Sequence, residues 1–161
     1  MRFRSLTMRD LFDFEQDGRY PLRRIPMIVR LKLDAAGVKL PLIGWALLSR
    51  EQREALVDMP CSSDEEIEAY RQTIAKMLLP HADNPDAALE LIPVPAMPAW
   101  RNVATVPEQV CLQLAELSLP VPDLQRWRGL SDLQRFALIK LTRNRHKNAN
   151  LHAALREFGL A

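Results

Sequence analysis

A twelve-residue pattern occurs twice in this chain and limits what the chain can fold into. Residues 45–56 and 127–138 agree at seven of twelve positions: Trp, Leu, Ser, Gln, Arg, Ala and Leu. Ser49 and Ser131 are each followed three residues later by glutamine. This is the spacing of a capping box, in which the serine and glutamine side chains satisfy free backbone N–H groups at a helix start. Each copy therefore predicts a helix that begins directly after its serine.

The similarity extends upstream of the two boxes. Ile25-Pro26 matches Val106-Pro107 at a spacing of 81 residues, and the apolar residues that follow match as well. In the first copy these residues fit a strand or one helical face, but the second copy favours a helix, because its apolar spacing is helical and Ala115-Glu116 are good helix formers. Each unit reads helix, proline-containing turn, tryptophan and capped helix. The predicted repeat units are 25–59 and 106–143.

These patterns predict an all-α fold, with a single domain over residues 1–161. We expect about six helices, with two related helix pairs at the centre. A further capping box at Ser63 precedes a helix that Pro80 ends. Residues 12–17 suggest a short extended pattern. Residues 93–107 contain four prolines, which predicts a stiff connector held to the core by Trp100.

The charges balance overall but are unevenly distributed. The net charge is +2, and 48% of the residues are hydrophobic, which argues against disorder. Residues 1–60 carry 11 basic and 8 acidic side chains, residues 61–100 carry 2 and 7, and residues 101–161 carry 9 and 5. The acidic middle segment fits either a solvated face or a polar docking surface.

Other features narrow the class of protein. Two cysteines are too few for a disulfide scaffold. No apolar run approaches the roughly 20 residues that span a membrane. The first residues show no secretory signal, so we expect a cytoplasmic protein. None of the three histidines lies in a catalytic or metal-binding motif, and no glycine-rich phosphate loop is present. The sequence therefore predicts that the protein is not an enzyme and binds neither a metal nor a cofactor.

Three groups of residues are candidates for a binding surface. The first is the pair of boxes, where each tryptophan and arginine serves either core packing or a surface. The second is a basic pair near residue 31. The third is a basic stretch after residue 140, which could bind an anion or simply form a solvated loop that caps the last helix. The candidate residues are Trp45, Arg53, Trp127 and Arg135, then Arg30 and Lys32, then Arg143, Arg145, His146, Asn148 and Asn150.

Several long stretches carry a resemblance to a known family. They are Phe12-Asp13-Phe14-Glu15, residues 22–34, residues 37–40, Trp45 with Leu48-Ser49, and Leu133-Gln134-Arg135-Phe136-Ala137-Leu138 with the following His and Asn residues. Through these stretches the chain resembles the nitrate-reductase-associated protein family, over roughly residues 12–80 and 127–158. Lys147 departs from the acidic residue usual at its position in the family.

The resemblance implies a non-catalytic accessory or maturation protein that supports assimilatory nitrate reductase by protein binding. Its implied partners are nitrate reductase and the molybdenum-cofactor machinery, with no membrane; a homodimer stays open. One alternative is a small-molecule or molybdenum-cofactor-binding protein that uses the basic loop from His146 to Asn150. A second, less favoured alternative is a nucleic-acid-binding regulator, which requires Lys140, Arg143, Arg145 and Lys147 to share one face.

Overall fold

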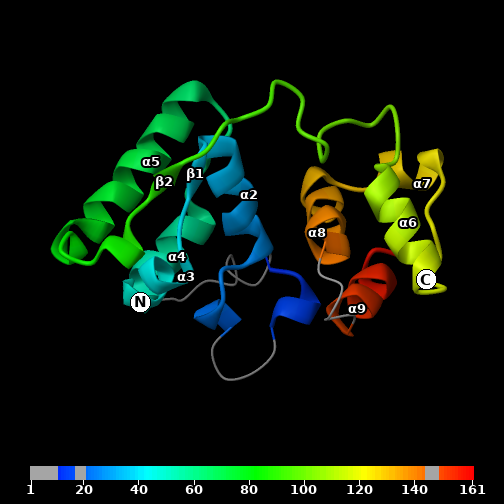
Figure 1. Cartoon of the computed structure of the whole chain (residues 1–161), viewed down its shortest axis with the longest axis horizontal. Helices are drawn as coiled ribbons and strands as arrows, with labels where there is room; N and C mark the ends of the chain where they lie inside the picture. The colour runs from blue at the N-terminus through cyan, green and yellow to red at the C-terminus, as the bar shows by residue number, and fades with distance from the viewer. Residues whose placement is uncertain (1–10, 17–20, 144–148) are drawn as a thin grey trace. The chain divides into compact units, whose positions relative to one another are not determined.

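The computed structural model describes residues 11–16, 21–143 and 149–161. The chain forms two compact units, shown with their helices labelled in Figure 1. The first comprises the chain up to Leu11 and Glu15–Val94, and the second comprises Phe12–Phe14 and Pro95–Ala161. That residues 1–161 make a single domain stays a prediction.

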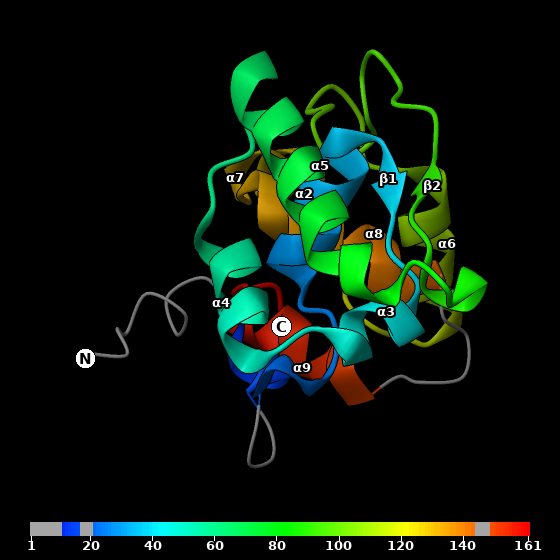
Figure 2. The same ribbon diagram turned by 90° about the vertical axis from the view of Figure 1, so that its left-hand side faces the viewer.

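The first unit consists of helices and one short antiparallel ladder. The ladder pairs Val38 with Leu91 and Lys39 with Glu90, and Figure 2 shows its two strands side by side. After the 3-10 helix η1 (Asp13–Glu15), the elements in chain order are η2 (Pro21–Arg23), α2 (Met27–Ala36), β1 (Val38–Lys39), α3 (Leu42–Leu47), α4 (Arg50–Asp58), α5 (Asp64–Leu78), η3 (Leu79–His81), η4 (Pro85–Ala87) and β2 (Glu90–Leu91).

Local hydrogen bonds explain where the helices begin and end. Ser49 and Ser63 precede α4 and α5, and each makes both halves of its capping box. Ser131 and Gln134 make the same two bonds, at 3.1 and 2.9 Å, in front of α8. The capping boxes are therefore confirmed. Gly37 ends α2 with φ at +71°, a left-handed conformation that glycine adopts without steric cost.

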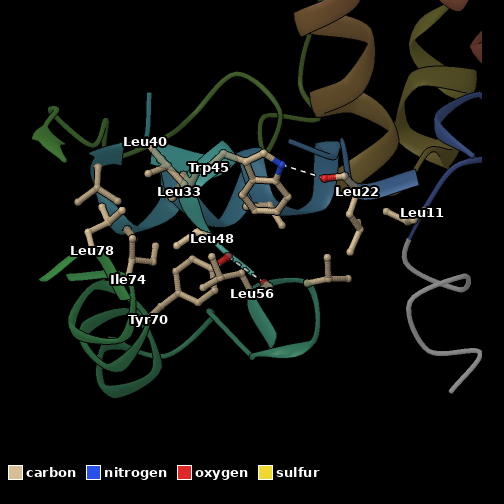
Figure 3. Close-up of a cluster of buried hydrophobic side chains, with 14 residues drawn as sticks. Leu11, Leu22, Leu33, Leu40, Trp45, Leu48, Leu56, Tyr70, Ile74 and Leu78 are labelled. Atoms are coloured by element: carbon tan, nitrogen blue, oxygen red, sulfur yellow. Dashed lines mark hydrogen bonds between the residues drawn. The ribbon is translucent and has the colours of Figure 1, made fainter. Parts of the chain in front are cut away.

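The core of the first unit lies between α2, α4 and α5. Helix α2 contributes Val29 and Leu33, and it packs against α5, which contributes Tyr70 and Ile74. Figure 3 shows Leu33, Tyr70 and Ile74 in the same cluster of buried side chains as Trp45. The Tyr70 hydroxyl group can be buried with its ring because it donates a hydrogen bond to the Leu56 carbonyl at 2.8 Å.

The second unit contains α6 (Glu108–Glu116), α7 (Leu124–Gly129), α8 (Asp132–Arg143) and α9 (Ala149–Glu157). Helix α8 packs against both α6 and α9. Its core is built from apolar residues at helical spacing, including Val110, Leu114, Phe136, Leu138, Leu151 and Leu155. In the proline-rich connector, the Trp100 ring meets the Phe136 ring edge-on at 6.4 Å, which agrees with the expected anchor.

Residues near the start of the described chain complete the second unit. The Phe12 ring lies 4.9 Å from the Phe158 ring, and the Asp13 backbone N–H donates to the Glu157 carboxylate at 3.0 Å. Asp13–Glu15 form the 3-10 helix η1, so the expectation of an extended pattern over 12–17 is wrong for these residues, while residue 17 lies outside the described part of the chain. The cause is the packing of the two neighbouring phenylalanines, Phe12 and Phe14, which stack on each other at 5.3 Å.

The predominantly helical fold is confirmed, with eight α-helices among the described residues instead of about six. The additional elements include α3 and α7, six-residue helices that each carry a box tryptophan. Such short helices contain too few turns to show a helical period in the sequence. Both units place a longer helix, a tryptophan-bearing short helix and a serine-capped helix in the same order, but the internal repeat as such stays a prediction.

Candidate functional site

The two tryptophans predicted for a binding surface are fully buried, so the structure corrects that assignment. The Trp45 indole N–H donates to the Leu22 carbonyl at 2.9 Å, as the dashed line in Figure 3 shows. The Trp127 indole N–H donates to the Asn102 carbonyl at 3.3 Å. Each ring fills the core of its unit, and its polar atom is satisfied there. Neither is available to a partner in this structure.

The arginines of the two boxes are turned inward as well. Arg53 donates to the carbonyls of Trp45 (3.2 Å), Ala46 (3.1 Å) and Leu22 (3.3 Å), and its guanidinium lies 5.5 Å from the centre of the Trp45 ring. Because the guanidinium is planar with five N–H donors, one side chain can hold several loop carbonyls at once. Arg53 thus fixes the turn between α3 and α4.

Arg135 has the same role in the second unit. Only 5% of this residue is exposed. Its guanidinium donates to the carbonyls of Trp100 (2.8 Å), Trp127 (3.3 Å) and Leu130, and it also contacts Asp132. The placement of Arg135 on a binding surface is therefore corrected, because its donors are directed at backbone carbonyls of its own unit.

The basic pair on α2 divides between the interior and the surface. Lys32 donates to the carbonyls of Val57 (2.6 Å) and Met59 (2.5 Å), which lie at the C-terminal end of α4 where carbonyls lack helical partners. Arg30 is exposed, and its Nε–H donates to the Ile25 carbonyl at 2.9 Å. Of the two, only Arg30 offers a charge on the surface.

Most of the third candidate group lies outside the described residues, namely Arg145, His146 and Asn148. Arg143, at the end of α8, and Asn150, in the first turn of α9, are both exposed. Between them these two side chains do not define a site. The hypothesis of a phosphate-binding loop from His146 to Asn150 therefore stays a prediction.

A surface that sequence reasoning missed lies on the outside of α3. This helix buries only Gly44 and Trp45. The exposed fractions of Leu42, Ile43 and Leu47 are 62%, 48% and 36%. Together with the exposed Ala46, these residues form the outer face of α3. Scattered exposed leucines are ordinary, but three large apolar side chains on one six-residue helix form a contiguous patch.

Comparison with α7 shows that the fold does not require this apolar face. Helix α7 also buries its tryptophan and precedes a serine-capped helix. At the positions of Ile43 and Ala46, however, α7 carries the exposed polar residues Gln125 and Arg128. A polar outside is therefore compatible with the same local structure. This difference between the two boxes is visible in the sequence and could have indicated the surface.

The buried face of α3 packs on η4, which also lines a small cavity together with η3 and the end of α5. A Cβ atom at Gly44 would lie only 2.9 Å from the Ala87 carbonyl oxygen. Glycine thus permits this close contact. The cavity has a volume of about 290 Å³ and a mostly apolar lining of Ala75, Leu78, Leu79, His81, Ala82, Asn84, Ala87, Ala88 and Leu89.

Charged side chains of both signs flank this surface, since Lys39 and Lys76 are exposed as well as the nearby carboxylates. Residues 40–49 carry no charged side chain, and residues 77–94 carry no lysine or arginine. The latter segment exposes three carboxylates, those of Asp83, Asp86 and Glu90. The outer face of α3 itself carries no charge and therefore suits a partner that offers apolar side chains.

The reactive groups near the first core are held in unreactive forms. Cys61 donates its thiol to the Lys32 carbonyl at 3.5 Å, and burial raises the pKa of this thiol, only partly offset by the Lys32 ammonium. Burial likewise raises the pKa of Tyr70. Within residues 11–16, 21–143 and 149–161, no three His, Cys, Asp or Glu side chains gather in a group that could hold a metal ion.

No helix in the described part of the chain is both long enough and apolar enough to cross a membrane.

Comparison with known proteins supports the resemblance noted above. No curated protein and no solved structure matches the chain. The model of one protein family matches residues 11–158, which include both tryptophan boxes, the outer face of α3 and all eight α-helices. Since this match spans nearly the whole chain, the protein belongs to the family described as conserved nitrate reductase-associated protein.

Proposed function

We propose that this protein is a non-catalytic accessory protein that supports nitrate reductase by binding to it through the outer face of α3. The observation that carries the proposal is the apolar surface formed by Leu42, Ile43 and Leu47, which the equivalent helix α7 lacks. Exposed apolar patches weaken solubility unless a partner covers them, so a contiguous one indicates an interaction. The family description supplies the partner.

The chemistry of the surface is that of a binding site. Apolar side chains on a short helix provide the centre of an interface. Such docking would hold nitrate reductase in a form ready for insertion of its molybdenum cofactor, or bring it to its electron donor, in the cytoplasm during nitrate assimilation.

The other two functions have less support. Binding of a phosphate-bearing cofactor by Arg135 conflicts with the engagement of its guanidinium by internal carbonyls. A nucleic-acid surface after residue 140 would need Lys140, which lies 5.2 Å from the centre of the Phe136 ring. For both functions, Arg143 is exposed and could contact the ligand.

The test compares two substitutions at equivalent positions. Ile43→Lys places a charge on the outer face of α3, whereas Gln125→Lys places the same charge at the matching position of α7. Each tagged protein is used to recover partners from nitrate-grown cells, and nitrate reductase is quantified by mass spectrometry. Circular dichroism confirms that both variants fold.

We expect the wild type and Gln125→Lys to recover similar amounts of nitrate reductase. Ile43→Lys should recover at least tenfold less. A tenfold loss corresponds to about 1.4 kcal/mol of binding free energy, which is within the value of one large apolar side chain. Absence of nitrate reductase from the wild-type sample would contradict the proposed partner. Equal recovery with all three proteins would contradict the proposed surface.

A further inference from the structure

The second unit contains a groove that no part of the proposed function uses. It lies between α6 and α8 and has a volume of about 710 Å³. Four of its lining residues come from α6 and two from the last turn of α8: Gln109, Leu112, Gln113, Glu116, Thr142 and Arg143. Its volume lies within the roughly 300–1,000 Å³ of typical ligand sites.

One wall of the groove carries a buried polar side chain that has no hydrogen-bond partner among the described residues. Gln113 is only 8% exposed, yet its carboxamide makes no hydrogen bond to any residue that the structure describes. Buried carboxamides are normally paired, because desolvation without a hydrogen bond destabilises the fold. The groove therefore presents one donor group and one acceptor that a ligand can satisfy.

Gln109, one helical turn earlier, is an exposed residue that lines the groove beside it. Its Nε2 donates to the Thr142 hydroxyl at 3.2 Å and to the Ile139 carbonyl at 3.4 Å, which ties α6 to α8. Because its N–H groups are directed at α8, its carbonyl oxygen is the group left to accept from a ligand. The two glutamines thus offer hydrogen-bonding groups in a row along α6.

The spacing of this row matches an extended polypeptide. Residues four apart on an α-helix are separated by about 6 Å along the axis. Alternate residues of an extended chain are separated by about 6.6 to 6.8 Å, and they direct their backbone N–H and C=O groups to the same side. A carboxamide can pair with both groups of one such residue. We propose that the groove between α6 and α8 binds an extended peptide segment, with Gln113 pairing to its backbone.

The rim adds side-chain preference to this backbone pairing. Arg143 follows Thr142, so it lies at the Gln109 end, whereas Glu116 lies nearly one turn beyond Gln113. The peptide therefore has an acidic residue near Arg143 and a basic one near Glu116. Leu112, which is 62% exposed, offers an apolar contact between them. With one cation and one anion among its lining residues, the groove does not suit a nucleic-acid backbone.

The experiment uses a random dodecapeptide phage library selected on the purified full-length protein. Peptides enriched on the wild type are synthesised, and their dissociation constants are measured by isothermal titration calorimetry. The same measurements are made on Gln113→Met, which keeps the volume of the side chain but removes both hydrogen-bonding groups. Gln125→Met, at an exposed glutamine of α7, is the matched control.

We expect at least one enriched peptide to bind Gln113→Met tenfold or more weakly than the wild type, with Gln125→Met within twofold of it. The melting temperature of Gln113→Met should equal or exceed that of the wild type, because an unpaired carboxamide is removed. Leu112→Glu, at an exposed position that tolerates the change, should also weaken binding at least fivefold.

Three results would overturn the inference. The first is that the selection enriches no peptide. The second is that every enriched peptide binds wild type, Gln113→Met and Leu112→Glu with the same affinity, and the third is that Gln113→Met melts several degrees below the wild type. The last would mean that solvent already satisfies the carboxamide. The inference is independent of the proposed function, because Ile43→Lys leaves this groove intact and Gln113→Met leaves α3 intact.

Discussion

Replacement of Arg135 tests whether the arginine of the second box holds its own unit together or binds an anion. The guanidinium holds three backbone carbonyls of the second unit. The Trp127 carbonyl also accepts from the Leu130 N–H, so it keeps a partner when the arginine is removed. Among the described residues, the Trp100 and Leu130 carbonyls have no other donor.

The expected cost follows from these two carbonyls. Each buried acceptor left without a partner destabilises a fold by about 1–3 kcal/mol. Arg135→Met should therefore lower the free energy of unfolding by about 4 kcal/mol, a large part of the roughly 5–15 kcal/mol typical of a domain. Arg135→Lys should lower it by about 2 kcal/mol, because one ammonium cannot reach the carbonyls that a planar guanidinium spans.

Urea denaturation followed by far-ultraviolet circular dichroism measures both values. Arg143→Lys, on the exposed end of the same helix, is the control, and its effect should stay within about 0.5 kcal/mol. If Arg135→Lys also changes the unfolding free energy by less than about 0.5 kcal/mol, the internal contacts do not hold the fold. A role for the charge itself would then regain support.

Three further substitutions test single contacts. Ser118 ends α6 with φ at +57°, where most side chains are strained, so Ser118→Gly should raise the free energy of unfolding by about 1 kcal/mol in urea denaturation; a decrease would contradict this. Lys32→Met should lower the same quantity by about 2 kcal/mol, because the last carbonyls of α4 lose their donor; no change would show that water replaces the ammonium. Burial raises the pKa of the Cys61 thiol above its ordinary value, so the folded state favours the protonated form. This stabilisation is present below the pKa of the unfolded thiol and is lost as pH rises through the folded pKa. The melting temperature should therefore fall above about pH 9, and less steeply in Cys61→Ala; identical slopes would exclude this thiol as a cause.

Features governed by neighbouring residues were predicted correctly from the sequence. The serine-led boxes place the starts of α4, α5 and α8, because a capping hydrogen bond joins residues only three apart. The helical character of α2 and α6 follows from apolar spacing in the same way. The family resemblance also depends on sequence alone, and the match over residues 11–158 confirms it.

The direction in which each side chain points was decided by tertiary structure. The boxes place Trp45 and Arg53 together, but local spacing cannot show whether they face solvent or a core built from residues 20 or more positions away. Leu22, whose carbonyl accepts from both, closes that interior. Packing likewise leaves Ile43 outside and Gln113 inside, against their polarity. Because hydrophobic burial depends on which surfaces meet, and not on sequence order, both candidate sites became visible only in the folded chain.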